Sequence, residues 1–196
     1  MKKKWKEHLI IFAIASIPII TLLTSLEQSP FQYTLSMMGN WFGFDDRFKF
    51  IIWGIFTSIL LTVAIYSIYK KTGVENKNAY RATVASGLFL ILAVLTPTPH
   101  RSPVPPELRT FNIDLHNIFG TLFVISIVLS LYIFSKYLSK KDRRISSIID
   151  KFFIITIGGT IIMLVLFGMT GIFELYFFIS ISVALIIAEK LIGKET

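Results

Sequence analysis

Long uncharged stretches dominate the chain, and short polar segments separate them. A helix that spans a membrane needs about 20 mostly apolar residues. Stretches of this kind cover residues 9–26, 48–69, 80–96 and 113–137. The stretch 152–188 is too long for one span, and Gly168-Met-Thr-Gly171 in its middle predicts a turn that divides it into 152–167 and 172–188. We therefore expect six spans in one domain, residues 1–196; five spans with one re-entrant segment is the alternative.

The expected fold class is all-α, an integral membrane bundle of six transmembrane helices. Backbone polar groups inside a bilayer must be satisfied within the protein, which restricts spanning segments to helices and barrel strands. Uninterrupted apolar runs of this length favour helices. The first run follows a basic start, Met1-Lys-Lys-Lys-Trp-Lys, and no small-residue cleavage site follows it. We expect this span to be retained as a signal anchor.

Composition and charge agree with a membrane protein. Of the residues, 54% are hydrophobic and 16% are charged, against about 25% charged residues in an average soluble domain. The absence of cysteine excludes disulfides, thiolate metal sites and thiol nucleophiles. The net charge is +8, but the basic residues lie at the ends of apolar runs, which argues against nucleic acid as a partner.

The positions of the basic residues also predict an orientation. With the N-terminus inside, six spans leave only four of the 20 Lys and Arg outside, namely Arg47, Lys49, Arg101 and Arg109. Cytoplasmic loops of membrane proteins carry an excess of such residues. We therefore predict a multi-pass protein of the cell membrane with both termini in the cytoplasm.

Two of the expected outer segments are long enough to form part of a site. Residues 27–47 are aromatic and apolar but too short to span, and we expect a short helix or cap along the outer interface. The segment after the third span contains Pro97, Pro99, Pro103, Pro105 and Pro106. Because proline fixes φ and lacks a backbone donor, this loop should be stiff and non-helical.

Two ionisable residues stand out within the spans. His116 opens the fourth span, and helical spacing places Gly120 on the same face. Glu174 lies near the outer end of the sixth span. An ionisable residue at membrane depth favours function. The alternatives are a structural hydrogen bond for His116 and, for Glu174, a carboxylate placed favourably at a helix N-terminus.

Further polar residues extend the candidate site. Ser36 beside a histidine would suit a hydrolase, so Ser36, His116 and Glu174 form the candidate catalytic set; the alternative for Ser36 is a capping serine. His100, His116 and Glu174 are permitted zinc ligands, but their spacing is not diagnostic, and the cofactor stays open between zinc and none. Asp114 fits a helix N-cap as well as a ligand contact. The candidate substrate-binding residues are His100, Arg101, Arg109 and Asp114.

Three short motifs point to a known group of proteins. They are Tyr33-Thr-Leu-Ser36-Met-Met-Gly39, Leu95-Thr-Pro97 and Leu115-His116-Asn-Ile-Phe119-Gly120. With these motifs the chain resembles a family of six-span bacterial membrane proteins of unknown function that groups with the Frag1, DRAM and Sfk1 proteins of eukaryotes. The residues that carry the resemblance are Ser36, Gly39, Pro97, His116 and Gly120. The resemblance implies a lipid-related role, in lipid remodelling or in maintaining lipid distribution.

Together these features predict an integral membrane protein with an outward-facing polar pocket that binds or processes a membrane lipid or another amphiphile. Hydrolysis is one route, with His116 or Glu174 as general base for water or Ser36. Two alternatives stay open. One is a non-enzymatic membrane partner or regulatory subunit, and the other is a small transporter, either of them alone or as a homo-oligomer. The sequence does not decide whether the protein is an enzyme.

Overall fold

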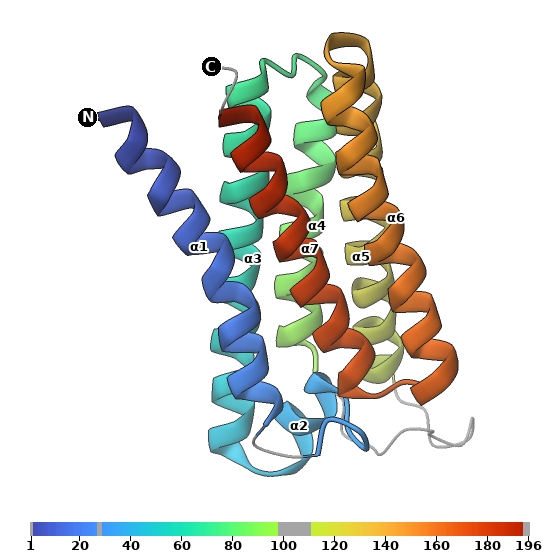
Figure 1. Ribbon diagram of the computed structural model, residues 1–196. Coiled ribbons are helices and arrows are strands. Elements are labelled where there is room, and N and C mark those ends of the chain that lie inside the picture. Colours follow the sequence, from blue (N-terminus) through green and yellow to red (C-terminus); the bar gives the residue numbers. More distant parts are fainter. Residues whose placement is uncertain (1, 27–28, 98–110, 194–196) are drawn as a thin grey trace.

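The computed structural model describes residues 2–26, 29–97 and 111–193, and all regular elements in these ranges are helices (Figure 1). Six helices are long and apolar enough to cross a membrane, which confirms the all-α fold with six candidate spans. The helix α2 is short and lies in the segment expected to form a cap. The helices are α1 (Lys2–Ser25), α2 (Leu35–Trp41), α3 (Phe44–Thr72), α4 (Lys77–Leu95), α5 (Phe111–Lys141), α6 (Arg143–Phe167) and α7 (Gly171–Gly193).

The turn predicted within 152–188 is present, because α6 ends at Phe167 and α7 begins at Gly171. Between them Gly168 has a φ of 69°, a conformation that favours glycine. The start of α6 differs from the sequence expectation: the helix begins at Arg143 and not near residue 152. The side chain of Asp142 caps it by accepting the Ile145 N–H at 2.9 Å. The apolar run therefore marks only the part of α6 that suits hydrocarbon, and the helix extends beyond it.

The six long helices form a closed ring. Each packs against the next long helix along the chain, and α7 packs against α1 to close the ring. The helices α3 and α7 also touch each other across it. The short α2 packs against α3 and α1, at the end of the bundle opposite the chain termini (Figure 1).

Polar side chains join α3, α4 and α5 inside the bundle. The buried Tyr69 hydroxyl lies 2.7 Å from Ser130 Oγ, and Thr83 Oγ1 lies 2.6 Å from the same Ser130 oxygen. Ser130 in turn donates to the Ala79 carbonyl at 3.0 Å. Hydrogen bonds of this kind hold helices together where lipid supplies no hydrophobic driving force.

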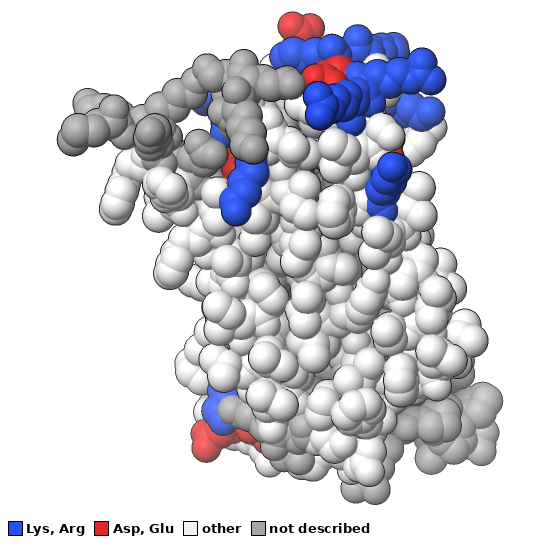
Figure 2. Space-filling view, viewed as in Figure 1, with Lys and Arg blue, Asp and Glu red and all other residues white. Residues whose placement is uncertain are grey.

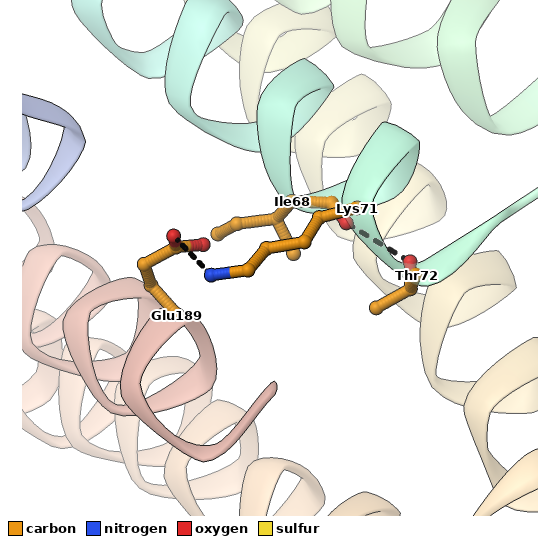
Figure 3. Close-up of polar contacts among 4 residues, drawn as sticks. All are labelled: Ile68, Lys71, Thr72 and Glu189. Atoms are coloured by element: carbon orange, nitrogen blue, oxygen red, sulfur yellow. Dashed lines mark hydrogen bonds and ion pairs between the residues drawn. The ribbon is translucent and has the colours of Figure 1, made fainter. Parts of the chain in front are cut away.

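An ion pair joins the ends of α3 and α7 near the chain termini (Figure 3). Lys71 Nζ donates to Glu189 Oε1 at 2.8 Å, and the Glu189 side chain is fully buried. Its other oxygen, Oε2, is buried and has no hydrogen-bond partner within the described part of the chain. Lys71 is therefore the charge that makes the buried Glu189 tolerable.

Charge is distributed unevenly along the bundle axis. Figure 2 shows Lys and Arg gathered at the end where α1 begins and α7 ends, next to a long face without charge. The exposed members of this basic end include Lys136, Lys140, Lys141, Arg143 and Arg144. Both ends of the described chain thus lie on the basic side of the molecule (Figure 1).

Candidate functional site

A cavity of about 670 Å³ lies between the helices, with α2 among its walls. Residues from every helix except α1 line it. Most of the lining is apolar, and much of it is aromatic. The Trp53 ring centroid lies 5.2 Å from that of Phe178 and 5.6 Å from that of Phe50. The aromatic lining residues are Phe50, Trp53, Phe123, Phe173, Phe177 and Phe178.

Glu174 lies in the first turn of α7 and connects α7 to α2. Its Oε2 accepts the Leu35 backbone N–H at 2.6 Å, at the start of α2. In the opposite direction, Gly171 N–H donates to the Tyr33 carbonyl at 2.7 Å, and Ile172 N–H donates to the Pro30 carbonyl at 3.1 Å. The first N–H groups of a helix have no partner within that helix. Here α7 supplies an acceptor for α2, and the segment before α2 supplies two acceptors for α7.

Glycine at position 171 permits this connection. A Cβ at this position would lie 2.7 Å from the Tyr33 carbonyl oxygen, closer than real Cβ atoms come to a backbone atom. Any larger residue would push the segment before α2 away from α7. The position of Glu174 in the cavity wall therefore depends on Gly171.

His116 lies in the first half of α5 and hydrogen-bonds to a backbone carbonyl at the end of α4. Its Nδ1 lies 2.8 Å from the Ala93 carbonyl oxygen. In a longer helix that carbonyl would accept from the N–H of residue 97, but residue 97 is proline and has none. Since a carbonyl can only accept, Nδ1 carries the proton, and Nε2 is the acceptor of the neutral ring.

Arg47 makes a second bond to the same helix end, which the sequence did not indicate. Its Nη2 donates to the Leu95 carbonyl at 2.8 Å. Two side chains from different helices, α3 and α5, thereby satisfy carbonyls at the end of α4.

Ser36 lies in the first turn of α2, but the capping residue is Thr34. Thr34 Oγ1 accepts the Met37 N–H at 3.1 Å, which is the standard N-cap bond. Ser36 Oγ lies 2.9 Å from Thr34 Oγ1. Ser36 also lines the cavity.

The structure brings Ser36, His116 and Glu174 to one cavity, from three helices that are far apart in the sequence. Gly120 lines the same cavity, and no atom lies within 4 Å of the point where its Cβ would be. Sequence reasoning missed several polar lining residues, because Thr and Asn in apolar helices look like ordinary packing residues. They are Thr34, Asn117, Thr121 and Thr160.

For the other predicted site residues the structure does not test a place beside the cavity. His100, Arg101 and Arg109 lie outside the described residues. For Asp114 the N-cap interpretation is wrong: α5 begins at Phe111, so Asp114 lies within its first turn. Among the described residues, no three His, Cys, Asp or Glu side chains are grouped to hold a metal. The zinc set of His100, His116 and Glu174 stays a prediction, because His100 is not described.

Comparison with known proteins gives one match. Residues 9–188 match the family described as "protein of unknown function (DUF998)". No curated protein and no solved structure matches the chain. The match agrees with the expected resemblance to a six-span family of unknown function, while the grouping with the Frag1, DRAM and Sfk1 proteins stays a prediction.

Proposed function

The chain belongs to this family of proteins of unknown function, and we propose that it is an integral membrane protein that binds a lipid or another amphiphile in the cavity between its helices. The observation that carries the proposal is the placement of Ser36, His116 and Glu174 on one cavity whose remaining lining is mostly apolar. An amphiphile has the same division into one polar group and a long apolar part. The volume of about 670 Å³ suits a ligand of that kind.

The polar residues have to supply the selectivity. An acyl chain already lies in a hydrocarbon environment, so it gains little when it moves from the bilayer into an apolar cavity. Selection among amphiphiles must then come from hydrogen bonds to the polar group. In our proposal Ser36, His116 and Glu174 make these bonds, and the aromatic residues accommodate the chain.

We place the cavity at the outer side of the cell membrane. The support for this is the basic end of the bundle, which lies opposite α2 and has the charge expected of a cytoplasmic side (Figures 1 and 2). In this orientation the cavity takes up its ligand from the outer leaflet or from outside the cell.

The test fills the cavity without touching its polar groups. Gly120→Leu places a side chain in the open space beside α5, and Gly158→Leu is the matched control, because Gly158 also has open space but does not line the cavity. Both changes favour the helix, since glycine costs roughly 1 kcal/mol relative to good helix formers. Each variant is purified from native membranes in detergent, and its lipids are identified by mass spectrometry.

We expect one lipid class to be enriched over the bulk membrane in the wild type and in Gly158→Leu, and to be lost in Gly120→Leu. An identical lipid profile in all three proteins would contradict the proposal. If the retained lipid is recovered as cleaved products, the site also hydrolyses it, and the His116 Nε2 or the Glu174 carboxylate is the candidate base.

A further inference from the structure

Which of the cavity's polar groups donate hydrogen bonds, and which accept them, limits the kind of polar group that can bind there. Building on the proposed function, we infer that the polar group of the amphiphile is a hydrogen-bond donor without negative charge, a hydroxyl or a protonated amine, and is not a phosphate or a carboxylate.

Three lining groups offer hydrogen-bond acceptors to the cavity. The Nδ1 proton of His116 is donated to the Ala93 carbonyl, which leaves Nε2 as the acceptor of the neutral ring. Thr160 Oγ1 donates its proton to the Thr156 carbonyl at 2.6 Å, so its lone pairs are what it offers. A Glu174 oxygen can accept a hydrogen bond in either protonation state, and Oε2 already accepts the Leu35 N–H.

The described lining of the cavity contains no cationic side chain that would bind an anion. No Lys or Arg occurs among the described residues that line it. Arg47, the described cation at the end of α4, directs its Nη2 to the Leu95 carbonyl. A phosphate or carboxylate would then be buried in a largely apolar space with no Lys or Arg among the described lining residues, which is costly. The hydroxyls of Thr34, Ser36 and Thr121 and the amide of Asn117 are neutral groups that can donate or accept, and they do not discriminate.

A hydroxyl or a protonated amine satisfies this arrangement. Either group can donate to a Glu174 oxygen and to the acceptors on His116 and Thr160. The hydrogen bonds that a donor gains here, together with the cost of burying an anion, correspond to a preference of at least about tenfold.

Trp53 provides the readout, because it lines the cavity and only 3% of its surface is exposed. Replacing Trp5 and Trp41 by Phe leaves Trp53 as the single tryptophan of the chain, which has 3. Four amphiphiles with one brominated chain are titrated into the purified protein in detergent: an alcohol, a primary amine, a carboxylate and an alkyl phosphate. Bromine quenches tryptophan at short range, so each titration gives the concentration for half-maximal quenching of Trp53.

We expect the alcohol and the amine to reach half-maximal quenching at concentrations at least about tenfold lower than the carboxylate and the phosphate do. Glu174→Gln should reduce that difference severalfold or more, since glutamine keeps an oxygen for the Leu35 N–H but has an NH₂ donor in place of the second oxygen. Gly120→Leu should abolish saturable quenching by all four.

The possible failures are distinguishable. If the carboxylate or the phosphate quenches at an equal or lower concentration than the alcohol and the amine, this inference is wrong and the proposed function stands. If none of the four quenches saturably, or if Gly120→Leu leaves quenching unchanged, the proposed function itself is wrong.

Discussion

At the scale of single residues, the candidate site and the fold use the same side chains. His116 supports α4 through Nδ1 and has a second nitrogen for the cavity. Glu174 joins α2 to α7 and also lines the cavity. Both interpretations of these residues, structural and functional, therefore hold at once in our account. Substitutions that only remove the side chain cannot separate the two roles.

A pair of isosteric changes at His116 separates them. The side-chain nitrogen of asparagine matches Nδ1 of histidine in position, whereas that of glutamine matches Nε2. We expect His116→Asn to keep the bond to the Ala93 carbonyl and the thermal stability, but to lose amphiphile binding. His116→Ala leaves that carbonyl without its partner and should cost about 1–3 kcal/mol of stability. Thermal unfolding in detergent and co-purified lipid are measured for both variants.

The comparison with His116→Gln serves as the control, since it disrupts the bond to α4 and keeps a polar group near Nε2. Full lipid retention by His116→Asn would show that Nε2 takes no part in binding. Equal stability of His116→Asn and His116→Ala would show that the Ala93 bond contributes nothing.

At the scale of the elements, the ring closes through contacts between segments that are distant in the sequence. The helix α7 packs against α1, meets the segment before α2 at its start, and contacts α3 through Phe178 and Glu189. Lys71 and Glu189 make the α3–α7 contact specific, because Lys71 on α3 is the charge partner of the buried Glu189 within the described part of the chain (Figure 3).

This pair predicts a non-additive pattern of stability. Lys71→Ala leaves a buried carboxylate without a counter-charge and should destabilise the protein by about 3–5 kcal/mol. Replacing both residues by apolar ones of similar size, Lys71→Met with Glu189→Leu, should restore most of that loss. Thermal unfolding of the single and double variants in detergent checks this. A double variant less stable than Lys71→Ala would contradict it.

The number of spanning helices was predictable from the sequence, but the residues at which each helix begins and ends were not. Six spans follow from run length and from the turn at Gly168–Gly171, which are local properties. The early start of α6 depends on an amphipathic first part and on the cap at Asp142, which hydropathy does not detect. Lys71 and Glu189 each stand beside an apolar run, but only the tertiary contact between α3 and α7 shows them to be partners.

For the candidate site, the sequence was informative where polarity is rare. His116, Glu174 and Ser36 stand out against apolar neighbours, and they line one cavity. The aromatic wall was not predictable, because 18 phenylalanines are spread through the chain and nothing local separates those at the cavity from those that face lipid. The role of Thr160 was hidden for the same reason.

At the scale of the whole molecule, the polarity of the bundle predicts its orientation. Both ends of the described chain lie at the basic end, and the cavity has α2, from the opposite end, among its walls (Figures 1 and 2). We expect a fluorescent protein fused to either terminus to fold and fluoresce in the cytoplasm, and a periplasmic reporter enzyme at either terminus to be inactive. The same reporters inserted after Phe42, between α2 and α3, should give the opposite result. Reporter activity of the same kind at all three positions would overturn the orientation.

The central claim is that an amphiphile occupies the cavity beside Gly120, and the most direct test uses the absence of cysteine from the chain. Gly120→Cys introduces a single thiol at the cavity wall, and Gly158→Cys introduces one in open space that is not part of that wall. The rate at which a small maleimide labels each thiol is measured with increasing amounts of a long-chain alcohol. We expect the alcohol to slow labelling of Gly120→Cys saturably and to leave labelling of Gly158→Cys unaffected. Equal labelling rates with and without alcohol at Gly120→Cys, or equal protection of both variants, would contradict it.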